Sequence, residues 1–335
     1  MRNYLFVLLI AMPLVVILLP TLLVWYAPPI SIESRPQPVP TISVETETPG
    51  QVPIKVYRTA KKTIETIPIE SYIEGVVAAE MPAEFEVEAL KAQAMAARTY
   101  IVRRLQAGHF DDVPQGAQVL DTVKHQAFLD PAELKARWKE QYEWKRERIR
   151  QAVKATAGMV LTYQGLPIDA TFFSTSNGFT ENADEYWEKP IPYLKSVASP
   201  WDSESPRYVE KITMQRAVFE QKLGVALDVP AMSGSDSWYR ILTKTTGNRI
   251  GKIRIGTKEF SGREFRERLG LNSAAFTLQL KGNTVEITTR GYGHGVGMSQ
   301  WGANGMAKAG KSAEQIVKYF YQGIALENYQ NVLKS

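Results

Sequence analysis

The segment Glu86–Gln106, EVEALKAQAMAARTYIVRRLQ, restricts the fold of this chain more than any other. Five alanines stand in it between Ala89 and Ala97. Alanine has the highest helix propensity, and its small side chain lets a neighbouring element approach the helix closely. The segment therefore predicts a long helix near the centre of the packing.

A shorter helix is predicted just before it, over Ile69–Ala79, and leads to Glu80. Pro82 suits the first turn of a helix, because the N–H that proline lacks would be unpaired there. The long helix is therefore expected to begin at Pro82. Lys91 and Arg98 are close to two turns apart, which puts both cations on one face, roughly 10 Å from each other.

Glu80 is the candidate catalytic residue, and its neighbours are alanine and methionine. A carboxyl group in apolar surroundings has a raised pKa and can donate a proton near neutral pH. Lys91 and Arg98 would then hold an anionic or hydroxyl-rich substrate across Glu80. A solvated glutamate beside ordinary surface cations is an equally open interpretation of this spacing.

Composition places the chain among globular proteins, because 44% of its 335 residues are hydrophobic and 22% are charged. The net charge of +5 suits an acidic polymer or a membrane surface. It is too small to predict nucleic-acid binding. The absence of cysteine excludes disulfides, thiolate metal sites and a cysteine nucleophile.

The N-terminus predicts a membrane anchor. Tyr4–Trp25 is continuously apolar and uncharged, about the length that crosses a bilayer core, and Arg2 precedes it. No small-residue cleavage site follows, so we expect residues 1–27 to form an uncleaved single-pass anchor with the rest of the chain exported. The proline-rich residues 28–52 predict a tether, and residues 53–328 the catalytic domain.

The remaining patterns alternate between strands and helices without a regular βα repeat. A hairpin is predicted around Ala60–Lys62. Further strands are predicted at 159–163, 167–173, 238–244, 249–256, 275–281 and 284–290, and further helices at 130–158, 213–223, 261–269, 299–309 and 312–322. Such mixed runs predict the α+β class, as a single large mixed globular domain behind an N-terminal transmembrane helix. The charges from Lys135 to Arg150 indicate a solvated helix face.

A serine-rich segment, TFFSTSNGFTENADEYW, is the second candidate for substrate binding. Ser174, Ser176 and Asn177 supply short hydrogen-bonding groups that suit sugar hydroxyl and acetamido groups. Nearby aromatic side chains offer flat faces for pyranose rings, namely Tyr186, Trp187, Tyr193 and Trp201. An ordinary loop with Ser/Asn turn chemistry is the competing interpretation.

The third candidate is GYGHGVGMSQWGANGMAKAG, residues 291–310. Its glycines alternate with other residues, so it lacks the dinucleotide-binding spacing, and they let the backbone take unusual dihedrals or approach a ligand. His294 would orient Glu80 or contact a sugar, although a lone histidine is more often structural. With only His109, His125 and His294 and no paired spacing, no metal site is predicted, and no cofactor is expected.

Together, the segments EMP-x-x-F-x-x-EALKAQA-x-AARTY, FFSTSNG-x-T and GYGHGVGMSQWGA resemble the family of stage II sporulation protein D, to which the amidase-enhancer domain also belongs. The resemblance runs from about Val52 to Leu326. It implies a lytic transglycosylase that cuts peptidoglycan strands stripped of stem peptides, during septal thinning and engulfment in sporulation. The cut leaves 1,6-anhydro-MurNAc ends.

The resemblance also implies residue roles. Glu80 is the expected acid/base, and the expected glycan-binding residues are Lys91, Arg98, Ser174, Ser176, Asn177, Tyr193 and His294. A metal site of some relatives is not carried over, because no cysteine stands near His125. Implied partners are glycan strands, a sporulation amidase and another engulfment membrane protein. The implied location is the mother-cell membrane, facing the septal wall.

Two alternatives stay open. A non-catalytic module would bind glycan and stimulate a partner amidase, as the enhancer relatives do. A two-carboxylate muramidase would use Asp202 or Glu185 beside Glu80, because hydrolysis normally needs a second carboxylate.

Overall fold

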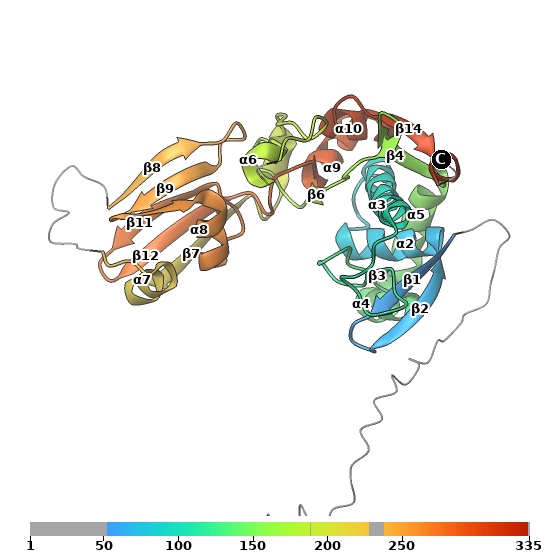
Figure 1. Cartoon of the computed structure of the whole chain (residues 1–335), viewed down its shortest axis with the longest axis horizontal. Helices are drawn as coiled ribbons and strands as arrows, with labels where there is room; N and C mark the ends of the chain where they lie inside the picture. The colour runs from blue at the N-terminus through green and yellow to red at the C-terminus, as the bar shows by residue number, and fades with distance from the viewer. Residues whose placement is uncertain (1–51, 188, 228–237, 334–335) are drawn as a thin grey trace, which may run out of the picture. The chain divides into compact units, whose positions relative to one another are not determined.

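The computed structural model describes residues 52–333, apart from 188 and 228–237 (Figure 1). Its first elements are β1 (Pro53–Arg58) and β2 (Thr63–Pro68), which pair antiparallel with Ile54 opposite Ile67. The short β3 (Val119–Leu120) joins β1 in parallel. The predicted hairpin is confirmed.

The alanine-rich segment forms α3 (Val87–Ala107), and the preceding helix is α2 (Ile69–Glu80). All five alanines from 89 to 97 are buried. Helices α2, α5, α9 and α10 and strand β4 pack around α3, so its central position is confirmed (Figure 1). The expected start at Pro82 is wrong. Residues 82–86 form a turn in which the Phe85 N–H donates to the Pro82 carbonyl, and the helix begins only at Val87.

The helix predicted over residues 130–158 is two helices. Asp130 caps α4 (Pro131–Trp138) by a capping box with Glu133. A 3₁₀ turn, η1 (Lys139–Gln141), then leads into α5 (Tyr142–Ala155). Lys139, the C-cap of α4 and first residue of η1, has a φ of 50°, outside the right-handed helical region, so the break lies there.

Two small sheets complete this part of the fold. Strands β14, β4 and β5 form one sheet, and β6 and β13 pair in parallel in the other. The bounds are β4 (Met159–Tyr163), β5 (Leu166–Pro167), β6 (Phe172–Phe173), α6 (Ala183–Trp187), η2 (Pro200–Glu204), β13 (Met298–Ser299), α9 (Gln300–Lys308), α10 (Ala313–Phe320), β14 (Ala325–Asn328) and α11 (Tyr329–Val332).

The segment between η2 and β13 builds a second hydrophobic cluster around Phe219, Phe265 and Ile287. Its sheets have the orders β11-β12-β7 and β10-β9-β8. The elements are β7 (Val209–Gln215), α7 (Arg216–Leu223), β8 (Tyr239–Lys244), β9 (Ile250–Ile255), β10 (Lys258–Ser261), α8 (Gly262–Leu269), β11 (Phe276–Lys281) and β12 (Thr284–Arg290). The helix predicted from Thr213 starts at Arg216, because Thr213–Gln215 belong to β7 and pair with β12.

The mixed order of strands and helices confirms the α+β class. Within the described part of the chain, no helix combines the length and the apolar character needed to cross a membrane. The anchor predicted at residues 1–27 and nearly all of the tether lie outside the described residues.

Candidate active site

Glu80 is the last residue of α2 and is held at both its side chain and its backbone. The Ala127 N–H donates to Glu80 Oε1 at 2.8 Å. Gln300 Nε2 donates to the Glu80 carbonyl at 3.1 Å. Two segments distant in sequence therefore fix the position of this carboxyl group.

Burial raises the pKa of Glu80, and the hydrogen bond from Ala127 opposes that rise only in part. The carboxyl also follows the C-terminal turn of α2, the negative end of the helix dipole, which disfavours a second negative charge. The environment of Glu80 thus favours the protonated form of its carboxyl group more than water does.

Glu80 lines a cleft of about 590 Å³. One wall is the turn from Ala78 to Phe85, and the others come from α4, α5, Ser174, Pro206–Arg207 and the start of α9. The rings of Phe85 and Trp301 meet edge-to-face at 4.9 Å between centroids. The cleft therefore offers an aromatic wall beside a single desolvated acid, a combination suited to a sugar substrate.

Three cations line this cleft: Arg137, Lys145 and Arg207. Lys145 Nζ lies 2.6 Å from Glu84 Oε1. Although burial acts in the opposite direction, this ion pair holds the pKa of Glu84 below its ordinary value. Arg207 stacks over the Tyr292 ring at 4.7 Å, and neither it nor Arg137 has an ion-pair partner among the described residues. Both guanidinium groups are available to an anion.

The expected cation pair on α3 lies elsewhere. Arg98 is completely buried and bonds both oxygens of Glu70, at 2.6 and 3.0 Å, and the carbonyl of Met159. Lys91 pairs with Glu88 at 2.6 Å and does not line the cleft. The predicted clamp of Lys91 and Arg98 across Glu80 is therefore not formed, because each cation is used inside the fold.

The three candidate residues of the serine-rich segment have different surroundings in the structure. Ser174 lines the cleft with Glu80, as expected. Ser176 is fully buried, and its N–H donates to Asp202 Oδ1 at 2.7 Å. Asn177 Nδ2 donates to the Gly247 carbonyl, so this side chain joins the segment to the β8–β9 turn. Only Ser174 is placed to touch a ligand beside Glu80.

The predicted aromatic platform is likewise dispersed. The Tyr193 hydroxyl accepts the Asp169 N–H at 2.9 Å, and its ring packs on Tyr163. Trp201 packs against Gly305 of α9. Tyr186 and Trp187 line a separate pocket of about 300 Å³. The aromatic residues of the Glu80 cleft are instead Phe85, Trp138 and Trp301.

His294 does not reach Glu80. Its Nε2 donates to the Phe172 carbonyl at 3.1 Å, and its Nδ1 accepts the Val296 N–H. Burial among Phe173, Tyr186 and Trp187 lowers the pKa of His294 to about 4. The imidazole is therefore neutral, is held by backbone groups and does not orient Glu80, while its expected contact with a sugar stays a prediction.

The alternating glycines bring two chain segments together rather than approaching a ligand. Gly291, Gly293, Gly295 and Gly297 all have positive φ values, between 81° and 119°. A Cβ on Gly297 would lie 2.1 Å from the Thr171 carbonyl oxygen, and one on Gly295 would strike Arg249. Residues 291–297 thus lie directly against the serine-rich segment and position Ser174.

The two carboxylates considered as partners of Glu80 lie outside its cleft. Asp202 is fully buried and accepts bonds from Ser176, Ser199 and Ser299. Glu185 lines the pocket of Tyr186 and accepts the Thr246 N–H. Neither is placed to activate a water beside Glu80.

The part of the chain that contains Glu80 also matches known proteins. A family model described as stage II sporulation protein matches residues 57–163, which include Glu80. Stage II sporulation protein D of Bacillus subtilis is 52% identical over 279 residues, covering 83% of this chain and 80% of that protein. The chain belongs to the stage II sporulation protein D family.

Two further relatives of this family member differ in how closely they match. The protein of the same name from Bacillus amyloliquefaciens is 48% identical over 287 residues, covering 86% of this chain and 81% of that protein. The amidase enhancer of Bacillus subtilis is 28% identical over 309 residues, covering 77% of this chain but only 40% of that protein. The resemblance seen in the sequence motifs is confirmed.

Proposed function

We propose that this chain is a lytic transglycosylase that cuts the bond between N-acetylmuramic acid and N-acetylglucosamine in peptidoglycan strands without stem peptides. The observation that carries the proposal is the state of Glu80. It is a desolvated carboxyl in an aromatic-lined cleft, and among the described residues its side chain is hydrogen-bonded only by a backbone N–H. The other carboxylate of the cleft, Glu84, is neutralised by Lys145.

One carboxyl group suffices for this reaction. Protonated Glu80 donates its proton to the glycosidic oxygen as the bond to C1 breaks. The resulting carboxylate takes the proton of the muramic C6 hydroxyl, whose oxygen closes onto C1 as the 1,6-anhydro sugar. The raised pKa of Glu80 favours the first step, and the regenerated acid is ready for another cycle.

Removal of a stem peptide leaves a lactyl carboxylate on the muramic acid, and this anion needs a cation in the cleft. Arg207 and Arg137 are the candidates, since both line the cleft and keep their guanidinium groups without an ion-pair partner among the described residues. They replace Lys91 and Arg98 in this role. Ser174 is placed to bond a sugar hydroxyl beside them.

The family name of the relatives supports a role in sporulation, and the amidase enhancer supports a functional link to an amidase that removes stem peptides. We propose septal thinning and engulfment as the process, with the domain held outside the cytoplasm by an anchor at residues 1–27. The link to an amidase also supports a second candidate function. In it, the chain binds glycan and stimulates the amidase without cutting.

One experiment separates the two. The purified full-length chain and its Glu80→Gln variant are incubated with glycan strands that retain or lack stem peptides, and the products are analysed by mass spectrometry. Anhydro-muramic ends from the wild type on stripped strands, and none from the variant, establish the transglycosylase. Intact binding without any product from either protein, together with faster amidase action, establishes the enhancer.

A further inference from the structure

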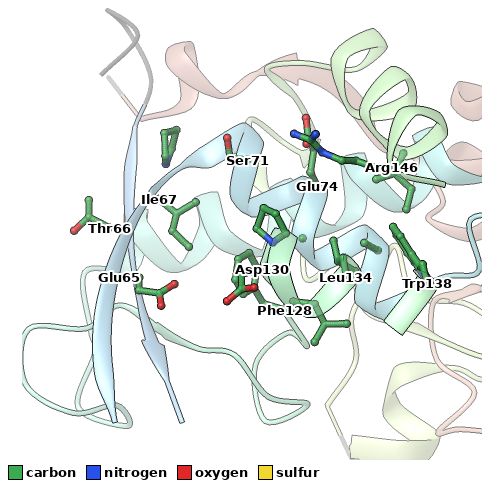
Figure 2. Close-up of a pocket in the computed structure, with 16 residues that line it drawn as sticks. Glu65, Thr66, Ile67, Ser71, Glu74, Phe128, Asp130, Leu134, Trp138 and Arg146 are labelled. Atoms are coloured by element: carbon green, nitrogen blue, oxygen red, sulfur yellow. The ribbon is translucent and has the colours of Figure 1, made fainter. Parts of the chain in front are cut away.

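A second cavity, of about 420 Å³, adjoins the cleft of Glu80 (Figure 2). It lies between β2, α2, the segment 128–131, α4 and α5. Ala78 and Trp138 line both cavities. The two hollows therefore share a wall and lie side by side at the C-terminal part of α2.

The lining of this cavity combines flat apolar surface with a few polar groups. Ile67, Phe128, Leu134 and Trp138 supply the apolar surface. Ser71, Glu74 and Arg146 lie along one side of it (Figure 2). Aromatic faces with a small number of polar side chains are typical of sites that bind a sugar ring.

The polar groups differ in whether the fold already uses them. Glu65 and Asp130 both pair with Arg58 and Lys61. Glu74 and Arg146, in contrast, have no hydrogen bond or ion pair within the described part of the chain. Burial raises the pKa of Glu74, and the charge of Arg146 opposes this. The half-buried Glu74 carboxyl thus has cations nearby but no hydrogen bond within the described residues, and it can accept one from a ligand hydroxyl.

We propose that this cavity is a second saccharide subsite, which holds a further sugar of the glycan strand that lies in the Glu80 cleft. The inference rests on the proposed function for the identity of the ligand. Ser71 and Ala78, on the α2 wall, are seven residues apart and so about 10 Å apart along the helix axis. This length is comparable with that of a disaccharide, so the subsite extends the cleft by a short stretch of strand.

The subsite is also connected to the acid. Phe128 lines it, and the preceding residue, Ala127, donates its N–H to Glu80. Gly75 makes room for Phe128, since a Cβ there would lie 2.3 Å from the ring. Phe128 is buried, with Tyr72 stacked on its ring and Arg58 over it, so it links the wall of the subsite to the donor that holds the Glu80 carboxyl.

The test is the dependence of binding on strand length. Full-length protein carrying Glu80→Gln, so that no strand is cut, is titrated with the GlcNAc-MurNAc disaccharide and with progressively longer stripped oligomers. Ser71→Trp, which places an indole at the mouth of the subsite, and Glu74→Gln are introduced separately. Glu143→Gln, an exposed α5 residue that lines neither cavity, is the matched control.

We expect the two subsite variants to bind long oligomers about three- to tenfold more weakly and the disaccharide unchanged. The control should follow the parent protein at every length. Equal losses on short and long ligands, or no loss on either, would overturn the subsite. Because binding is measured without cutting, length-dependent losses alongside a wild type that makes no anhydro product would refute the proposed function and leave the subsite standing.

Discussion

The backbone N–H of Ala127 lies 2.8 Å from Glu80 Oε1, and this bond stabilises the ionised carboxylate against the burial that disfavours it. Burial is the larger effect, so the pKa of Glu80 is raised. A segment 47 residues away in sequence thus sets how readily the proposed acid gives up its proton.

Replacing Glu80 by glutamine should stabilise the fold in a pH-dependent way. The ordinary pKa of glutamate is about 4.3, and the folded-state pKa of Glu80 is higher. In this window the folded wild type binds more protons than the unfolded chain, so its free energy of unfolding falls as pH rises. The advantage of Glu80→Gln should grow from pH 4 and level off above the folded pKa, as measured by urea unfolding. A difference independent of pH would contradict a raised pKa.

Arg98→Ala should act mainly on stability. Removing this fully buried side chain leaves Glu70 and the Met159 carbonyl without their partner, which costs about 3–5 kcal/mol. Arg103→Ala, on the same helix, breaks only the exposed pair with Asp169 and should cost less than about 1 kcal/mol. Urea denaturation of both variants measures the contrast. If Arg98→Ala unfolded at the same urea concentration as the wild type but no longer bound glycan, Arg98 would be a substrate-binding residue after all.

Arg207→Ala should reduce selectivity for charged glycan. A lost contact with the lactyl carboxylate is worth about 1 kcal/mol, roughly a fivefold change in affinity. The loss should appear on stripped peptidoglycan strands, weaken at high salt and be absent on neutral chitin oligomers. Arg240→Ala, an exposed arginine of β8 that does not line the cleft, is the control. Equal losses on both ligands would exclude Arg207 as the carboxylate contact.

His294→Gln should reduce the loss of folding free energy that the wild type shows as the pH falls below 6.5. The folded-state pKa of His294 is lowered to about 4, and its unfolded value is about 6.5. Between these values the unfolded chain binds more protons, so the wild type loses stability as pH falls from 6.5 towards 4. Comparing the free energies of unfolding at pH 7 and pH 5 should give a smaller drop for the variant. A larger drop in the variant would show that another group dominates this range.

Gly297→Ala should be far more costly than Gly165→Ala, although the two φ values are 81° and 78°. The positive φ alone costs about 1–2 kcal/mol at either site. Only at Gly297 does a Cβ meet a backbone oxygen, at 2.1 Å, and this overpacking adds about 1–3 kcal/mol. Thermal unfolding of both variants gives the comparison, and equal costs would show that residues 291–297 can move away from Thr171.

Helices and strands were predicted well wherever the residues of the element itself determine its structure. The alternation in β1 and β2, the alanines of α3 and the proline and capping residues at Asp130–Pro131 each specify their own structure. The break between α4 and α5 was missed, since no glycine or proline marks it. It depends on the conformation of Lys139 alone.

The candidate site was predicted only in part. Glu80 and Ser174 were found from motifs, and they share the cleft. Arg98 was placed wrongly because its partner, Glu70, stands on another helix, and spacing along α3 says nothing about it. Arg137 and Lys145 were hidden in a run of charges that indicated a solvated face. Periodicity cannot tell which charged face turns towards a cleft.

Gln300, at the start of α9, donates to the Glu80 carbonyl, 220 residues away in sequence, and the neighbouring Trp301 completes the aromatic wall with Phe85. The cleft therefore does not exist in any chain that ends before α9, however completely α2 and α3 have folded. As the chain is synthesised from its N-terminus, the acid is made early and its site is assembled late. Wall-cutting activity would then begin only when almost the entire molecule is in place.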